Sequence, residues 1–225
     1  MMSSQNESPG LSSGLVDPAA YHSWYETPRG AWIAEQELGL MLSLLRPHPA
    51  RLLLDVGCGT GWFSSRFADT GLGVIGLDPD VLALRFARQR DGRIGCIKGQ
   101  AEALPFADAA FDYVAAVTSL CFVSDPILAL REMWRVSGQA VVLGLLHRHS
   151  LLWLRKRGRG SYRGARWDLL DEVRCWTREL APAPNIQAGW AVFLPSGGTI
   201  ARNIEAFLPN QLPIGSFLAV CLRRQ

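Results

Sequence analysis

The sequence predicts an α/β fold in which helices cover both faces of a doubly wound, mostly parallel sheet. Short apolar runs alternate with amphipathic segments along most of the 225 residues, an order typical of βαβ units. A glycine-rich turn at 57–61 separates the first apolar run from the helical pattern after it. Two strand-like runs close the chain, and one is expected to run against the others. We therefore expect one domain with a seven-stranded sheet whose last strand is reversed.

The N-terminal part is expected to contain a tail followed by a lid. Residues 1–19 are rich in Ser, Pro, Gly and Asn and are expected to form a flexible tail, so that a single domain spans 20–225. Apolar residues recur at helical spacing over 30–46, and Pro47 ends the pattern. A leading helix is therefore predicted within an N-terminal lid segment at 20–47.

The strands of the sheet are expected at the apolar runs that follow. The first five runs are separated by helical patterns or by a Pro-containing loop, so they are expected to be parallel. The last two are separated by a stretch with room for a short helix and form a closing pair. In chain order, the expected strands are 51–57, 72–78, 94–99, 111–117, 139–146, 185–195 and 215–224.

The composition limits the class of protein. The chain is 48% hydrophobic and 19% charged, and its net charge of +3 is too small to indicate a nucleic-acid protein by itself. The five cysteines form no CxxC pair or Cys/His cluster, so no metal site is predicted and a reducing compartment fits best. Neither a signal peptide nor a run of about 18 apolar residues occurs. We expect a cytoplasmic protein without a membrane anchor, either a monomer or a homodimer.

The glycine-rich turn is expected to hold a cofactor. Gly57, Gly59 and Gly61 follow the first strand, where a ligand can approach the backbone and face the N–H groups of the next helix. A dinucleotide fingerprint would need a glycine where Trp62 stands, and a phosphate-binding GxxxxGK[ST] loop is absent. Asp78 ends the second strand, where a carboxylate accepts hydrogen bonds from ribose hydroxyls. An adenosine cofactor that is not centred on phosphate fits these features, whereas a tight turn without a ligand is the structural alternative.

Four motifs in order make the chain resemble the class I methyltransferases that use S-adenosylmethionine, and in particular small-molecule members of the type 11 kind. The motifs lie between about 51 and 142 and read LLLDVGCGTGWF, LDPD, GQAEALPFADAAFDYV and SDPILALREMWRV. The resemblance implies a Rossmann-like fold and methyl transfer to a small-molecule acceptor by in-line displacement. It also implies S-adenosylmethionine as the cofactor and S-adenosylhomocysteine as its product.

The resemblance further implies a set of cofactor contacts. Asp55 would help hold the ammonium end, the backbone of 57–61 would pass beneath the methionine part, and Asp78 would bind the ribose. Residues 100–102 would flank the adenine. Relatives often have an acid at Gln100, so a hydrogen bond there to the adenine amino group lacks charge assistance. The complete expected set is Asp55, Gly57, Cys58, Gly59, Gly61, Asp78, Pro79, Gln100, Ala101, Glu102 and Thr118.

Candidates for the acceptor side come from three places. His147 follows the fifth strand, and a histidine suits a general base if the acceptor arrives protonated, with a structural histidine as the competing interpretation. Many relatives have a histidine after the fourth strand, where this chain has a Cys-Phe pair, so Phe122 is expected to form an apolar wall. Tyr21, Tyr25 and Arg29 precede the leading helix and are expected to form a lid over the ligands, or else an aromatic staple onto the domain.

A basic insertion at 151–167 separates the fifth strand from the closing pair. A solvated flexible loop is the default interpretation of such a run of charge. The cations also favour an anionic acceptor, or an RNA methyltransferase that uses the loop 155–166, although nucleic acid is not the expected partner. A non-catalytic S-adenosylmethionine-binding protein is the remaining alternative. The cations are Arg155, Lys156, Arg157, Arg159, Arg163 and Arg166.

Overall fold

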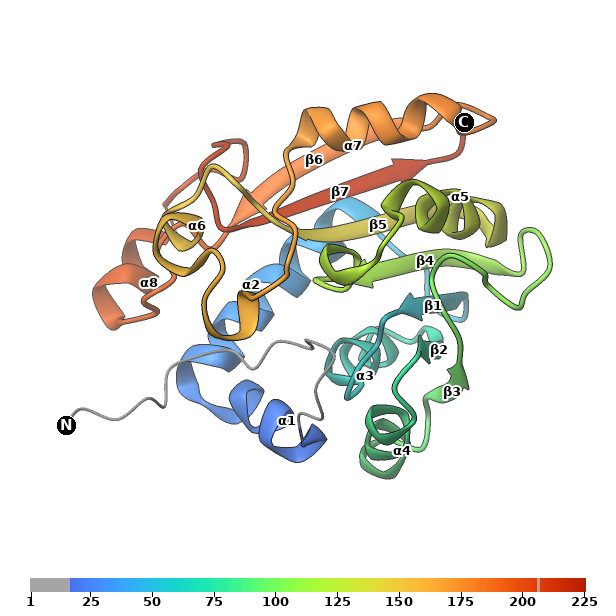
Figure 1. Ribbon diagram of the computed structural model, residues 1–225, viewed down its shortest axis with the longest axis horizontal. Coiled ribbons are helices and arrows are strands. Elements are labelled where there is room, and N and C mark those ends of the chain that lie inside the picture. Colours follow the sequence, from blue (N-terminus) through green and yellow to red (C-terminus); the bar gives the residue numbers. More distant parts are fainter. Residues whose placement is uncertain (1–16, 206) are drawn as a thin grey trace.

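The computed structural model describes residues 17–205 and 207–225, and one seven-stranded sheet forms its centre (Figure 1). Across the sheet the strands lie in the order β3-β2-β1-β4-β5-β7-β6. Strands β1 to β5 pair in parallel, and β7 runs antiparallel to both of its neighbours. The predicted doubly wound sheet with a reversed last strand is therefore confirmed. The strands are β1 (Leu52–Val56), β2 (Gly73–Asp78), β3 (Gly95–Lys98), β4 (Phe111–Val117), β5 (Ser137–Leu146), β6 (Asn185–Ala191) and β7 (Phe217–Arg223).

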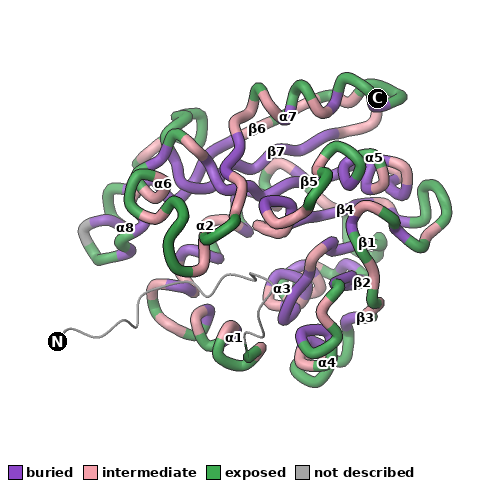
Figure 2. Tube along the Cα trace, viewed as in Figure 1, coloured by how far each residue is buried: buried purple, intermediate pink, exposed green. Residues whose placement is uncertain are grey.

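Helices cover both faces of the sheet. One apolar cluster joins α2 and α3 to one face, and a second joins α5 and α7 to the other. Figure 2 shows the result, with the central strands buried and the outer turns of the helices exposed. The helices are α1 (Pro18–Glu26), α2 (Pro28–Leu45), α3 (Trp62–Asp69), α4 (Val81–Arg90), α5 (Pro126–Val136), α6 (Leu151–Lys156), α7 (Leu170–Trp176) and α8 (Thr199–Glu205).

Strand β4 illustrates why the central strands read as continuous apolar runs. Tyr113, Ala115 and Val117 belong to the cluster beneath α2 and α3, whereas Val114 and Ala116 belong to the cluster beneath α5 and α7. Successive strand residues point to opposite faces, and both faces of this sheet are covered. All positions from Tyr113 to Val117 are therefore buried.

The N-terminal segment contains two helices where the sequence predicted one. Asp17 caps α1 by accepting a hydrogen bond from the Ala19 N–H at 3.1 Å, so residues 17–19 are not part of a tail; the predicted tail over 1–16 lies outside the described residues. Thr27 separates the helices, because its backbone is extended and its hydroxyl accepts from the Gly30 N–H at 2.9 Å. The predicted leading helix is confirmed as α2.

The basic insertion is not the flexible loop that its charge suggested. It contains α6 and a short 3-10 turn at 160–162, and Ser150 caps α6 by accepting from the Trp153 N–H at 3.2 Å. The Arg157 guanidinium lies 4.5 Å from the centre of the Trp153 ring, and Tyr162 packs against Trp167. Within the described ranges, no helix has the length and apolar character needed to cross a membrane.

Candidate active site

A pocket lies at the carboxyl ends of β1, β4 and β5, on the side of the sheet where α6 and α8 are found (Figure 1). It encloses about 1090 Å³ of space, its open mouth included. The glycine loop and the start of α3 form one wall, and α1, α2 and the basic insertion form the other. Its lining includes the four residues predicted for the lid and the apolar wall, namely Tyr21, Tyr25, Arg29 and Phe122.

The loop after β1 adopts a path that requires glycine. Gly57, Gly59 and Gly61 have φ values of +75°, +52° and +76°. A Cβ at Gly57 would lie 2.3 Å from the Ser119 Cβ, so a larger residue does not fit there. The Gly57 N–H donates to the Leu77 carbonyl at 2.7 Å. The loop is thus fixed to β2 through its backbone while its other side borders the pocket.

Asp55 places a buried carboxyl group at the floor of the pocket. Its Oδ2 accepts a hydrogen bond from the Ser64 hydroxyl at 2.6 Å, and the residue is only 1% exposed. Burial raises the pKa of Asp55 to about 7, although the Ser64 hydrogen bond opposes the shift. A cation brought into the pocket would stabilise the ionised carboxylate, so this site favours a positively charged ligand group.

Asp78 is buried at the end of β2 and holds the glycine loop. Its Oδ2 accepts from the Gly59 N–H at 2.8 Å and its Oδ1 from the Asp80 N–H at 2.9 Å. Burial raises the pKa of Asp78, and these backbone hydrogen bonds oppose the shift. Each carboxylate oxygen keeps a further lone pair for a ligand. Asp78 and its neighbour Pro79 do not line the pocket described above.

The residues predicted to flank an adenine lie next to Asp78 rather than in the pocket. The Gly99 N–H donates to the Asp78 carbonyl at 3.2 Å, so the segment at 100–102 begins beside the end of β2. Gln100 is exposed and Ala101 is buried, with 8% of its surface accessible. Most of the predicted cofactor set therefore falls into two groups, one within the pocket and one along the ends of β2 and β3, whereas Gly61 lies in the glycine loop but is not among the lining residues.

The turn after β4 carries a strained residue that borders the pocket. Thr118 has a φ of +47°, which is unfavourable for a β-branched side chain. Its N–H donates to the Gly144 carbonyl at 2.8 Å, and the Ser119 hydroxyl donates to the Val56 carbonyl at 2.7 Å. These contacts fix Thr118 beside the glycine loop, as its predicted contact with the ligands requires.

Helix α1 closes one side of the pocket through aromatic contacts. Tyr25 stacks on Trp62 with ring centres 5.0 Å apart, and the hydroxyls of Tyr21 and Tyr25 lie 3.1 Å apart. Burial raises the pKa of Tyr21 to about 12, so its hydroxyl keeps its proton. The His22 Nδ1 lies 3.0 Å from the Thr60 hydroxyl oxygen, which ties α1 to the glycine loop. Trp62, noted in the sequence only for its misfit with a dinucleotide turn, thus supports the lid.

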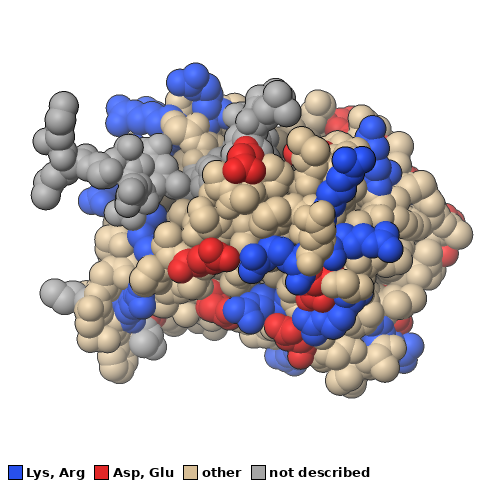
Figure 3. All heavy atoms as spheres, turned by 90° about the horizontal axis from the view of Figure 1, so that it is seen from below, with Lys and Arg blue, Asp and Glu red and all other residues tan. Residues whose placement is uncertain are grey.

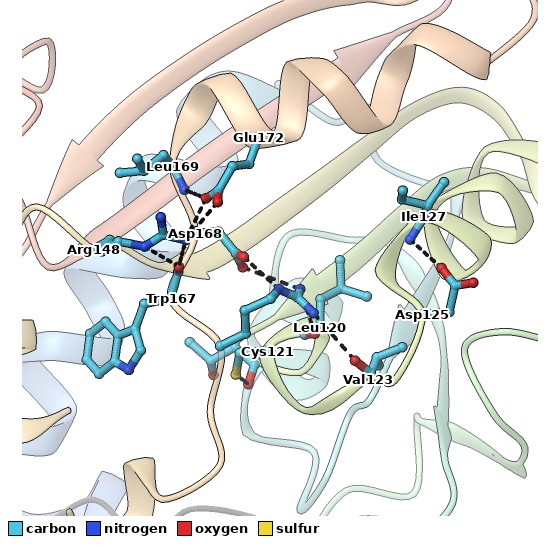
Figure 4. Close-up of polar contacts among 12 residues, drawn as sticks. Leu120, Cys121, Val123, Asp125, Ile127, Arg148, Trp167, Asp168, Leu169 and Glu172 are labelled. Carbon is cyan, nitrogen blue, oxygen red and sulfur yellow. Dashed lines mark hydrogen bonds and ion pairs between the residues drawn. The ribbon is translucent and has the colours of Figure 1, made fainter. Parts of the chain in front are cut away.

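Arg166 ties the end of the basic insertion to the turn after β4. Its partners Asp168, Leu120 and Val123 are labelled in Figure 4. Its Nε donates to Asp168 Oδ1 at 2.6 Å, its Nη2 to the Leu120 carbonyl at 2.9 Å, and its N–H to the Cys121 carbonyl at 2.8 Å. Asp168 is 1% exposed, and burial raises its pKa against the effect of Arg166. The network fixes the turn that carries Phe122 into the pocket.

His147 lies next to the pocket but is not among its lining residues. Leu146 lines the pocket, and consecutive strand residues point to opposite faces, so the His147 side chain is directed away. Its Nδ1 is 2.9 Å from the Gly215 carbonyl, and burial lowers the pKa of this 2%-exposed residue. The catalytic assignment of His147 stays a prediction that the pocket geometry does not support.

Glu37 is a pocket residue that the sequence reasoning missed. It lines the pocket from α2 together with Arg29 and Ile33, and the spacing of four residues places the three on one side of the helix. Burial raises the pKa of Glu37 to about 8. The signal available in the sequence was the spacing of Glu37, four residues after Ile33 on a helix that the apolar pattern had already predicted.

Comparisons with known proteins connect this geometry to a family. The family described as a methyltransferase domain matches residues 54–141. An uncharacterized protein of Mycobacterium tuberculosis is 40% identical over 173 residues, which cover 73% of this chain and 58% of that protein. A demethylmenaquinone methyltransferase of Renibacterium salmoninarum is 42% identical over 111 residues, or 48% of this chain and 47% of that enzyme. This chain thus spans about half the length of the curated relatives it matches.

A solved structure matches nearly the whole chain. It is that of an S-adenosylmethionine-dependent methyltransferase from Thermotoga maritima, with a TM-score of 0.73 and 24% identity. The match covers 92% of this chain and 96% of the other. It extends the likeness in fold beyond the matched domain to the N-terminal helices and the closing strands.

Proposed function

The chain carries a class I S-adenosylmethionine-dependent methyltransferase domain, and from this premise we propose that it transfers the methyl group of S-adenosylmethionine to a small-molecule acceptor. The cofactor supplies, when bound, an activated methyl group on a sulfonium. Catalysis then depends mainly on aligning the acceptor and on excluding water. The residues of the pocket have to perform these two tasks.

The residues at the glycine loop fit the proposed cofactor. Gly57 and Gly59 line the pocket with backbone alone, because neither has a side chain. An ammonium group placed beside the Asp55 carboxyl group would stabilise its ionised form. In the proposal, Asp55, 57–61 and Thr118 hold the methionine part. Asp78 with Pro79 holds the ribose, and the segment 100–102 flanks the adenine. Cys58 is buried within the loop, and burial keeps the pKa of its thiol high, so it acts as packing and not as a nucleophile.

The acceptor side of the pocket favours a small molecule. Aromatic rings from α1 and α3 and the side chain of Phe122 line it, and they suit an enclosed ligand from which water is excluded. The Renibacterium relative, by its name, acts on a small molecule as well. The basic insertion lines the pocket through Leu152, Ser161 and Tyr162, and none of its six cations is among the lining residues described. An anionic acceptor would therefore not meet the cations of the basic insertion that the sequence suggested for it, and Arg29 of α2 is the basic residue in the lining described.

The charge on the face of the molecule drawn in Figure 3 gives no support to the RNA alternative. On the face drawn in Figure 3, basic and acidic side chains are interspersed. Several arginines are paired, as in Arg66 with Glu35 at 3.2 Å and Arg93 with Asp69 at 2.9 Å. RNA binding requires a continuous basic surface with affinity that falls steeply as salt rises. We therefore keep the small-molecule acceptor as the proposed function.

The glycine loop with a buried acid on each side, Asp55 before it and Asp78 after it, carries the proposal. We would titrate S-adenosylhomocysteine calorimetrically into the wild type, Asp78→Asn and the exposed control Asp69→Asn. The proposal expects micromolar binding by the wild type and by the control. Asp78→Asn should bind roughly 10-fold to 100-fold more weakly, because it loses a charged hydrogen-bond acceptor. A folded wild type that does not bind would contradict the proposal.

A further inference from the structure

Glu37 is a carboxyl group that lines the pocket and forms no ion pair with a basic side chain of the described residues. It lies on the same side of α2 as Arg29, whose Nε donates to the Pro195 carbonyl at 2.8 Å. Within the part of the chain that the structure describes, it makes no hydrogen bond or ion pair, and burial is the only cause of its raised pKa. Glu37 is half-buried, and an acid that is partly removed from water without a partner is costly for a protein to keep. Its position therefore calls for a ligand group that complements it.

The fully buried acids Asp55, Asp168 and Glu205 each have a hydrogen-bond or ion-pair partner within the protein, and Glu37 differs from them in this respect. Asp55 accepts a hydrogen bond from Ser64 at 2.6 Å, and Asp168 is paired with Arg166 at 2.6 Å. Glu205 accepts from the Phe193 N–H at 2.9 Å. These contacts explain those acids as parts of the fold. No such contact explains Glu37.

Aromatic rings surround the same part of the pocket. Tyr25 and Trp62 are stacked at 5.0 Å with an angle of 14° between their planes, and Trp24 meets the edge of Tyr25 at 5.0 Å. Tyr21 and Phe63 complete this wall of the pocket. Aromatic faces attract cations, and they do so most strongly where water is excluded. A carboxylate and several aromatic rings facing one cavity form a site for an ammonium group.

We propose that Glu37 and the aromatic rings of α1 and α3 bind the ammonium group of the methyl acceptor, which is therefore an amine. This inference rests on the proposed methyltransferase function. The ammonium group of the cofactor is not the preferred occupant, because Asp55 already offers a carboxyl group beside the glycine loop. An amine acceptor also agrees with the absence of the cations of the basic insertion from the described pocket lining.

The raised pKa of Glu37 suits an amine in a second way. An alkyl ammonium has a pKa of roughly 10, and its nitrogen has no free lone pair until it loses a proton. A carboxylate whose pKa is about 8 accepts that proton more readily than an ordinary glutamate does. Glu37 can therefore first bind the ammonium group and then hold its proton at the carboxylate.

A binding experiment with three probes of the same shape tests the inference. Phenethylamine, phenethyl alcohol and phenylacetate differ in charge but share the aromatic ring and chain. They would be titrated into protein saturated with S-adenosylhomocysteine, using the wild type, Glu37→Gln and Glu35→Gln. Glu35 lies on the same helix but is exposed and paired with Arg66 at 3.2 Å, so it is a matched control. Thermal melting of each variant would confirm folding.

The inference expects the wild type and Glu35→Gln to bind phenethylamine more tightly than either other probe. Glu37→Gln should lose roughly tenfold or more of the phenethylamine affinity and keep its affinity for S-adenosylhomocysteine within about twofold. Equal affinity for the three probes, or a preference for phenylacetate, would overturn the inference. A large loss of S-adenosylhomocysteine affinity in Glu37→Gln would assign the carboxylate to the cofactor instead. A wild type that binds no S-adenosylhomocysteine would contradict the proposed function itself.

Discussion

The two ends of the pocket are held in place by different kinds of contact. At the glycine loop the backbone carries the structure, as in the hydrogen bond from the Gly57 N–H to the Leu77 carbonyl at 2.7 Å. Beneath the lid, contacts between side chains hold the structure in place, as in the stack of Tyr25 on Trp62 with ring centres 5.0 Å apart. A backbone path persists when neighbouring side chains change, whereas a side-chain contact does not. We infer that the cofactor end is fixed by the path of the chain and the acceptor end by residue identity.

The largest effect on ligand affinity is expected from Gly57→Ala, which changes the backbone of the glycine loop. The added methyl group would lie 2.3 Å from the Ser119 Cβ, at a φ of +75° that alanine adopts poorly. We expect a loss of stability of about 2–3 kcal/mol and a loss of S-adenosylhomocysteine affinity of roughly 100-fold. Calorimetric titration and thermal melting measure both quantities.

Gly39→Ala is the matched control for this prediction. Gly39 lies within α2, and a Cβ there would meet no atom within 4 Å. Alanine is favoured over glycine inside a helix by about 0.5–1 kcal/mol, so the control should be slightly more stable and should bind S-adenosylhomocysteine normally. If both variants lost affinity equally, the loop would have no special requirement for glycine.

The next largest effect is expected from Arg166→Met, which removes side-chain contacts at the acceptor end of the pocket. The change removes the partner of Asp168, which is 1% exposed, and frees the turn that carries Phe122. We expect a loss of about 2–4 kcal/mol, because an unpaired charge is left buried, and a weaker affinity for the acceptor probe. S-adenosylhomocysteine affinity should change little. Urea unfolding and probe titration separate the two effects.

Two further variants sharpen that test. Arg163→Gln changes an exposed cation of the same insertion and should leave stability within about 0.5 kcal/mol of the wild type. The double variant Arg166→Met/Asp168→Asn removes the unpaired charge and should recover part of the lost stability. No recovery would mean that the hydrogen bonds from Arg166 to backbone carbonyls, and not its pairing with Asp168, hold the turn.

The third prediction concerns pH, since each end of the pocket contains a buried acid. The pKa of Asp55 is raised from 3.8 to about 7 and that of Glu37 from 4.5 to about 8. At a pH between the ordinary and the raised pKa of each acid, the folded protein binds more protons than the unfolded chain. Its stability therefore falls as pH rises from about 4 to about 8. Each acid should contribute on the order of 2 kcal/mol, or several degrees in Tm. Thermal melting at constant ionic strength measures the slope.

Glu37→Gln and added ligand sharpen the pH prediction. Glutamine does not titrate, so the variant should lose less stability over the same pH range than the wild type. The nearby groups Tyr21 and Tyr25 keep their protons in this range, because burial raises the pKa of both. S-adenosylhomocysteine should flatten the part of the slope due to Asp55. A Glu37→Gln variant with the same pH dependence of Tm as the wild type would show that Glu37 is not protonated in the folded state.

The sequence predicted the backbone turn of the glycine loop better than the side-chain contacts around the lid, for a physical reason. The glycine loop and Asp78 depend on local backbone geometry, so their residues are contiguous and their spacing is informative. The strands were predicted for the same reason, because a strand covered on both faces is a continuous apolar run. The bounds of β4, Phe111–Val117, fell where the pattern placed them.

The acceptor end depends on contacts between residues far apart in the chain, which spacing does not encode. Arg166 lies in a run of cations that suggested solvent exposure, yet it pairs with Asp168 and with carbonyls after β4. In the sequence, Glu37 is one more polar residue on a predicted helix. Only the packing of α2 on the sheet directs it toward the pocket. Helix α1 was missed because its aromatic residues pack on α3 and lack a strong amphipathic pattern of their own.

The smallest effect is expected from His147→Asn, and it bears directly on how the acceptor end works. The imidazole lies against the Gly215 carbonyl at 2.9 Å, and its pKa is lowered by burial, so at neutral pH it is an uncharged structural group. Asparagine can donate to the same carbonyl, so we expect a loss of about 1 kcal/mol and S-adenosylhomocysteine affinity within about twofold of the wild type. Methyl transfer to an amine, once an acceptor is found, should fall far more in Glu37→Gln than in His147→Asn. A larger loss of methyl transfer in His147→Asn than in Glu37→Gln, with both variants folded, would assign the general base to His147.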